Sequence, residues 1–155
     1  MAAEVGHVAP DFKLKSSKME DVALSDFRGK NVLLLFFPLA FTPTLTTEFG
    51  LVENRLDEIH KANGEVLGIS VDSPFSQAKW AEQEGFRTTL LSDLGKETVK
   101  MYSTMYEDLM GMKGIAKRSA FLIDKSGTIV QKEILDDAKN LPDLDGLIGK
   151  MISMA

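Results

Sequence analysis

Runs of apolar residues alternate with amphipathic segments along most of the chain. Residues 32–37 form a short, continuous apolar run, which is typical of a strand covered on both faces of a sheet. The apolar residues that follow recur at three- and four-residue steps, as on one side of a helix: Leu45, Phe49, Val52, Leu56 and Ile59. Thr42 is suited to be the N-cap of this helix and Pro43 its first residue. Gly64 is suited to end it in the left-handed conformation.

The same order of strand and helix then repeats. Residues 65–72 predict a second buried strand, and residues 74–82 predict the helix after it. Because two such strands joined by a helix run parallel, we expect the loop after Phe37 at the carboxyl end of the sheet, where α/β proteins usually bind ligands. The other predicted elements are a strand over 89–93, a short helix over 96–102, a hairpin of 119–124 with 128–133, a final helix containing 144–152, and an N-terminal edge hairpin of 11–15 with 20–24.

The composition fits one domain without a metal centre. The 155 residues, of which 44% are hydrophobic, suffice for a single core, so we expect residues 1–155 to form one domain. The chain contains no cysteine, which excludes disulfides and thiolate metal ligands. His7 and His60 are the two histidines and are far apart in the sequence. We therefore expect no bound metal.

Charge and hydropathy limit the expected partners. The formal net charge is -5 and no basic run is present, so we expect neither nucleic acid nor an anionic membrane as a partner. No segment approaches the ~20 apolar residues of a membrane span. Residues 1–6 lack the basic head and apolar stretch of a signal peptide. A cytoplasmic protein is expected.

Five motifs, in this order of elements, resemble the peroxiredoxin family. They lie at residues 9–12 with 24–30, 36–48, 67–73, 90–93 and 118–124. The resemblance covers nearly the whole chain and implies an α/β fold of the thioredoxin type, with a central mixed sheet, helices on both faces and an N-terminal hairpin. It also implies a homodimeric thiol peroxidase without a cofactor, which reduces hydrogen peroxide and organic hydroperoxides. Details around 38–43 are similar to the one-cysteine and atypical two-cysteine bacterial branches.

The reactive position of that family is occupied by leucine in this chain. In the family, a proline is followed by three residues, a threonine, two residues and the reactive cysteine; here Pro38 and Thr42 match, and Leu45 stands in the place of the cysteine. Gly50 occupies a second position at which such relatives often carry cysteine. Only thiolate sulfur has the nucleophilicity that attack on a peroxide bond requires. The sequence therefore predicts a redox-inactive homologue or a cysteine-replaced variant.

The resemblance also implies roles for the side chains around this position. Pro38 would shield the sulfur from water, Thr42 would hydrogen-bond to peroxide oxygen, and Arg118 would stabilise both the thiolate and the leaving oxygen. The candidate catalytic positions are thus Pro38, Thr42, Leu45 and Arg118. The candidate substrate-binding residues are Pro38, Thr42, Thr44, Leu45, Glu48 and Arg118.

Each of these positions also has a simpler interpretation. Leu45 either fills the space of the sulfur or forms the floor of a repurposed pocket, rimmed by Thr42, Thr46 and Arg118, that binds a small apolar molecule or performs non-redox catalysis. Thr42 either caps the helix or contacts a ligand. Arg118 either acts on a ligand or forms a structural pair with Glu48. A third hypothesis is an interaction protein that uses the dimer surfaces of the family.

Residues 101–112 concentrate four of the eight methionines and both tyrosines. Methionine adapts its shape, so such a segment can form the lid of a pocket or face a partner. The simpler interpretation is a helix and loop packed on the core, because Tyr102 and Tyr106 are one helical turn apart.

Overall fold

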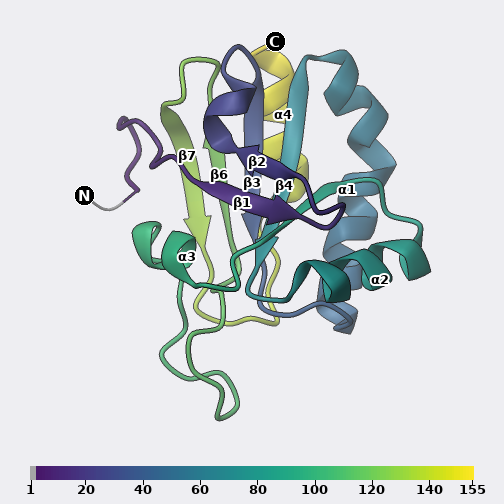
Figure 1. The fold of residues 1–155 in the computed structure, drawn as a ribbon. Helices are drawn as coiled ribbons and strands as arrows, with labels where there is room; N and C mark the ends of the chain where they lie inside the picture. The colour runs from purple at the N-terminus through teal and green to yellow at the C-terminus, as the bar shows by residue number, and fades with distance from the viewer. Residues whose placement is uncertain (1–2) are drawn as a thin grey trace.

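A seven-stranded mixed sheet forms the centre of the computed structural model, which describes residues 3–155 (Figure 1). The strand order is β2-β1-β5-β4-β3-β6-β7. Three inner strands run parallel: β3 (Asn31–Phe36), β4 (Gly64–Ser70) and β5 (Thr89–Ser92). The outer strands are antiparallel to their neighbours: β1 (Lys13–Ser16), β2 (Asp21–Ala23), β6 (Ser119–Ile123) and β7 (Ile129–Ile134). The first two residues of the segment 1–6 discussed above lie outside the described part.

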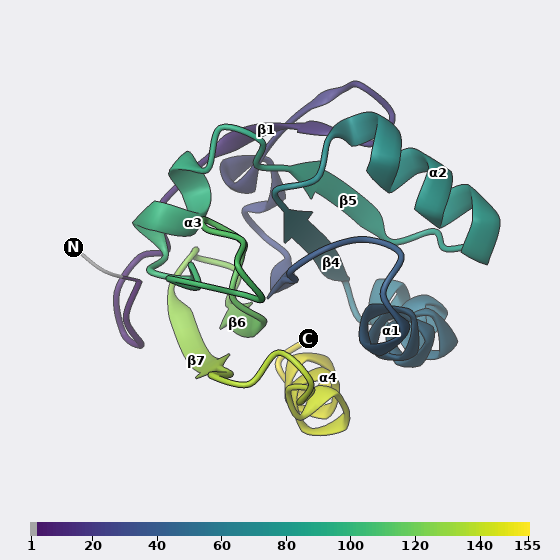
Figure 2. The ribbon, with the colours of Figure 1, turned by 90° about the horizontal axis from the view of Figure 1, so that it is seen from below.

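Helices cover both faces of this sheet (Figure 2). On one face lie α1 (Pro43–Lys61) and α4 (Leu144–Ser153), which contact each other. The short elements η1 (Leu24–Phe27) and α3 (Glu97–Met101) pack on the other face, and α2 (Pro74–Glu84) lies beside β5. Within the described chain, none of the helices combines the length and apolarity that crossing a bilayer requires.

The continuous apolar run of β3 divides its side chains between two cores. Val32, Leu34 and Phe36 join the cluster on the α3 face. Leu33 and Leu35 join the cluster that also contains the inner side of α1, the inner side of α4 and Trp80 of α2. Successive side chains of a strand point to opposite faces, so a strand buried on both faces must be apolar throughout. The predicted central strand and the mixed sheet with helices on both faces are confirmed.

Two local predictions were wrong. The left-handed residue after α1 is Asn63, with φ 57°, whereas Gly64 begins β4. A side chain at Gly64 would have its Cβ 3.1 Å from Ile59 Cγ2 and 3.2 Å from Met151 Sδ, so close packing explains this glycine. The second error concerns α3: Tyr102 and Tyr106 are buried, as the interpretation of a helix and loop packed on the core expected, but α3 ends at Met101, so they do not share a helix face.

The two tyrosines instead anchor two separate segments through their hydroxyl groups. Tyr102 donates to the carbonyl oxygen of Pro10 at 2.6 Å, and Tyr106 donates to that of Leu135 at 3.1 Å. Tyr106 belongs to the long loop between α3 and β6, which extends below the sheet in Figure 1. This loop reaches the carboxyl end of β3.

Candidate functional site

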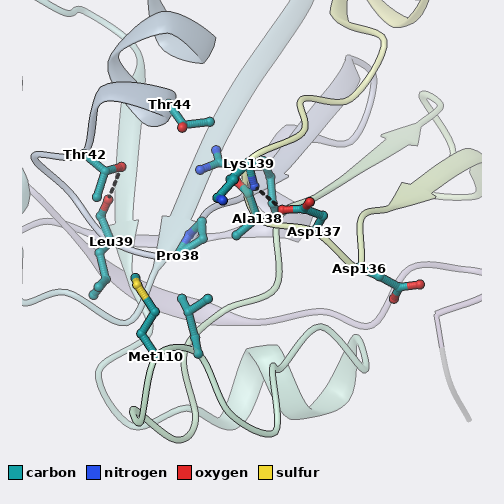
Figure 3. Close-up of a pocket in the computed structure, with 11 residues that line it drawn as sticks. Pro38, Leu39, Thr42, Thr44, Met110, Asp136, Asp137, Ala138 and Lys139 are labelled. Carbon is teal, nitrogen blue, oxygen red and sulfur yellow. Dashed lines mark hydrogen bonds between the residues drawn. The ribbon is translucent and has the colours of Figure 1, made fainter.

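A cavity of about 510 Å³ opens beside the first turn of α1 (Figure 3). Three loops build its walls: the loop after β3, the loop between α3 and β6, and the loop after β7. The lining residues are Pro38, Leu39, Thr42, Thr44, Leu109, Met110, Arg118, Asp136, Asp137, Ala138 and Lys139. The cavity therefore lies where the strand order predicted a ligand site.

Asp72 holds the loop after β3 in place. Its Oδ2 accepts a hydrogen bond from the backbone N–H of Ala40 at 2.8 Å and another from the Ser70 hydroxyl at 2.7 Å. Asp72 follows β4, which is parallel to β3, so both strand ends meet at one edge of the sheet. Asp72 was not among the residues predicted for the site, although a polar residue directly after a buried strand was the available signal.

Thr42 occupies the N-cap position of α1 but does not cap it through its side chain. Its backbone is extended, with φ -96° and ψ 146°, and Pro43 is the first helical residue, as predicted. The hydroxyl instead donates to the carbonyl oxygen of Leu39 at 3.2 Å. The predicted capping hydrogen bond was therefore wrong, and the Thr42 oxygen keeps its lone pairs for another donor at the cavity wall.

Arg118 and Glu48 form a buried ion pair behind the cavity. Arg118 is 1% exposed and Glu48 is fully buried. Nη1 of Arg118 donates to Oε1 of Glu48, and Nε donates to the carbonyl oxygen of Ala138 at 3.0 Å. The predicted pairing is confirmed.

The environment of Glu48 favours its neutral form. Burial raises the pKa of this carboxyl from 4.5 to about 7, although the neighbouring Arg118 acts in the opposite direction. Within residues 3–155, Oε2 of Glu48 has no hydrogen-bond partner. A buried oxygen without a donor adds to the cost of the charged state.

Leu45 belongs to the core and not to the cavity. Its side chain is fully buried within the apolar cluster of α1, α4 and the sheet. The cavity lining includes neither Leu45 nor Thr46 nor Glu48. The pocket floor expected at Leu45 is therefore absent from this cavity, and the space-filling interpretation of Leu45 agrees with the structure. Of the predicted substrate-binding residues, Pro38, Thr42, Thr44 and Arg118 do come together.

Gly50 lies on α1, and the packing around it does not require a glycine. A Cβ at this position would meet no atom within 4 Å. Lack of space is thus excluded as an explanation, and nothing else in the structure explains this glycine.

The sequence analysis missed the walls formed by the two later loops. Among residues 3–155, Met110 is the most exposed of the large apolar side chains, at 84%, and forms the tip of a tight turn with Gly111, both with positive φ. Its side chain reaches from this loop toward the cavity (Figure 3). The methionine-rich composition of 101–112 was a signal for this wall, whereas no pattern marked residues 136–139.

Within residues 3–155, no three acidic or histidine side chains meet in a way that could hold a metal ion.

The fold and the cavity together define a class of protein. The sheet is of the thioredoxin type with an added N-terminal hairpin, and the cavity at the start of α1 is lined by Pro38, Thr42 and Arg118. This is the arrangement of a peroxiredoxin. Residues 5–132 match the AhpC/TSA family, and the chain belongs to this family.

Known relatives agree with this assignment. The chain is 38% identical over 139 residues to peroxiredoxin Bcp of Escherichia coli K12, covering 88% of this chain and 87% of that protein. It is also 38% identical over 145 residues to the mitochondrial thioredoxin-dependent peroxide reductase of Drosophila melanogaster, covering 87% of this chain and 60% of that protein. The crystal structure of peroxidoxin BcpB from Mycobacterium tuberculosis superposes with a TM-score of 0.86 at 25% identity, covering 98% of each chain.

Proposed function

We propose that this chain is a peroxiredoxin scaffold without thiol peroxidase activity of its own. One observation carries the proposal: position 45, where the family motif has its reactive cysteine, holds a fully buried leucine, and the sequence has no cysteine elsewhere. Reduction of a hydroperoxide by a thiolate forms a sulfur–oxygen bond while the O–O bond breaks. A leucine side chain has no lone pair with which to begin this step.

The family motif supports a role for the remaining site residues. Pro38, Thr42, Thr44 and Arg118 line the cavity, Glu48 pairs with Arg118, and Leu45 packs beneath the first turn of α1. We propose that this arrangement still admits hydroperoxides, although no cysteine is present to be oxidised.

Peroxide consumption with a thiol reductant tests the loss of activity. Hydrogen peroxide and cumene hydroperoxide are each incubated with the natural chain and dithiothreitol, and we expect no consumption above the rate in buffer. The variant Leu45→Cys should form one equivalent of sulfenic acid per chain, detected by mass spectrometry after trapping with dimedone. Repeated, thiol-dependent turnover by the natural chain would overturn the proposal.

A matched control separates the site from the mere presence of a thiol. Leu51 lies on the same helix but is 44% exposed and outside the core cluster. The variant Leu51→Cys should react with peroxide only as fast as an ordinary exposed thiol. Leu45→Cys should react faster, because the family motif places its reactive thiol at this position and the N-terminus of α1 favours the thiolate. A slower reaction than that of Leu51→Cys would show that burial of position 45 in the apolar core outweighs the helix N-terminus.

A second candidate function is the binding of a small, neutral, apolar molecule in the cavity. Its volume of about 510 Å³ and its Pro, Leu, Met and Ala side chains suit such a ligand. Because apolar side chains form much of the cavity wall and the acidic Asp136 and Asp137 also line it, we expect neutral molecules to bind better than anions. Cumyl alcohol should therefore raise the melting temperature of the protein more than benzoate does, and Ala138→Trp, which fills the cavity, should abolish the shift.

We also propose that residues 1–155 form one domain, supported by the single sheet on which both apolar clusters pack. A homodimeric assembly, a role as an interaction protein and a cytoplasmic location stay predictions from the sequence.

A further inference from the structure

Met110 places the one sulfur atom of the cavity lining within reach of a bound ligand. Met110 shares the lining with Thr42 and Arg118, and no other methionine of residues 3–155 takes part in it. The left-handed backbone of Met110, with φ 51°, and the bridge between Leu109 and Met112 hold it at the tip of its turn. The sulfur that the first turn of α1 lacks is thus present on the opposite wall.

A thioether can accept an oxygen atom from a hydroperoxide without help from a thiol. The sulfur lone pair attacks the O–H oxygen of the hydroperoxide, a sulfur–oxygen bond forms and the O–O bond breaks. The proton of that oxygen moves to the departing oxygen, which leaves as water or an alcohol. The methionine sulfur loses two electrons and becomes a sulfoxide, and the hydroperoxide gains them.

The polar groups of the cavity suit this step. Two of the three guanidinium nitrogens of Arg118 are engaged, Nη1 by Glu48 and Nε by Ala138. Within residues 3–155, Nη2 has no hydrogen-bond partner, so it remains free to donate to the departing oxygen. The Thr42 oxygen can accept the hydroperoxide O–H, since its own proton goes to Leu39.

We propose that Met110 is the oxygen-accepting site for hydroperoxides that enter this cavity, with apolar organic hydroperoxides as the preferred class. This inference rests on the proposed function in one respect, namely that the cavity still admits hydroperoxides. Each chain reacts once, and a methionine sulfoxide reductase is the class of enzyme that would restore it. The product is a polar sulfoxide in a wall that is otherwise largely apolar.

Residue-resolved oxidation kinetics test this proposal. The natural chain is treated with increasing cumene hydroperoxide in the absence of any thiol, and the sulfoxide at each methionine is followed by peptide mass spectrometry. Met19, on the β1–β2 turn, is 48% exposed against 84% for Met110, so exposure alone predicts less than a twofold difference in rate. Binding in the cavity predicts that Met110 reacts about tenfold faster at low concentration and that its rate saturates, while the rate at Met19 rises linearly.

Two controls distinguish a bound reactant from a merely accessible sulfur. Met112 is 37% exposed in the same loop and does not line the cavity, so it should behave as Met19 does. Excess cumyl alcohol should compete at Met110 and leave Met19 and Met112 unchanged. Ala138→Trp should lower the rate at Met110 to the linear behaviour of Met19, and the competition experiment stands even where this variant does not fold.

A linear rate at Met110 within twofold of Met19, unaffected by cumyl alcohol, would overturn the inference. That failure is separate from a failure of the proposed function, which would appear as repeated peroxide turnover that requires a thiol reductant. Met110→Leu should remove the fast phase of sulfoxide formation and retain the slow one.

Discussion

On its inner side the first turn of α1 packs Leu45 into the core, while on its outer side Thr42 and Thr44 border a cavity. The inner side is fully buried and apolar; the outer side carries hydroxyl groups and receives two loops from distant parts of the chain. Arg118 connects the two sides, since it lines the cavity and pairs with the buried Glu48. The polar features of the site therefore do not depend on a reactive group at position 45.

The largest loss of stability is expected when the ion pair between Arg118 and Glu48, which connects the two sides of the helix, is broken. Arg118→Ala leaves the carboxyl of Glu48 buried without a partner, and removal of one member of a buried pair costs about 3–5 kcal/mol. Urea unfolding followed by circular dichroism measures this loss. The double variant Arg118→Ala with Glu48→Leu should recover most of it, and a loss below about 1 kcal/mol in the single variant would show that the pair is dispensable.

Truncation of one leucine on each side compares the core with the cavity directly. Leu45→Ala removes fully buried carbon atoms and should lower the free energy of unfolding by about 2–5 kcal/mol. Leu39 is half-buried and lines the cavity, so Leu39→Ala should cost about 1 kcal/mol. Equal losses in both variants, measured by urea unfolding, would contradict the assignment of Leu45 to the core.

The smallest of the three effects concerns the dependence of stability on pH. The pKa of Glu48 is about 7 in the folded chain against the ordinary 4.5, so the folded state binds more protons than the unfolded state between these values. The contribution of Glu48 to stability is therefore fully present below pH 4.5 and is lost as the pH rises through about 7.

Between pH 5 and 8, this loss should amount to about 2 kcal/mol. The free energies of unfolding of the natural chain and of Glu48→Gln, measured across this range, reveal it as a difference in slope. Parallel pH profiles would show that the Glu48 carboxyl stays ionised in the folded chain.

The sequence predicted the elements of this fold better than the walls of its cavity. The continuous apolar run of β3 and the three- and four-residue steps of α1 are local patterns, and Thr42 and Pro43 marked the start of the helix. The pairing of Glu48 with Arg118 was also predicted, although 70 residues separate them, because the family motif places both.

The cavity walls and the partners of some side chains depend on the tertiary arrangement and could not be predicted from the sequence. The loop 136–139 has no periodicity, and it joins the cavity because β7 ends at the same edge of the sheet as β3. For Leu45 the sequence left open a space-filling role and the floor of a pocket, and the structure places its side chain in the core and outside the cavity. The Thr42 hydroxyl had two acceptable partners nearby, and only the geometry of the loop selected Leu39.

The complete burial of Leu45 ties any chemistry at position 45 to the stability of the fold. A cysteine at this position would give up apolar contacts worth about 1–2 kcal/mol. The rate at which Leu45→Cys reacts with a hydroperoxide must therefore be compared with its free energy of unfolding, since a variant whose helix opens more often also exposes its thiol more often.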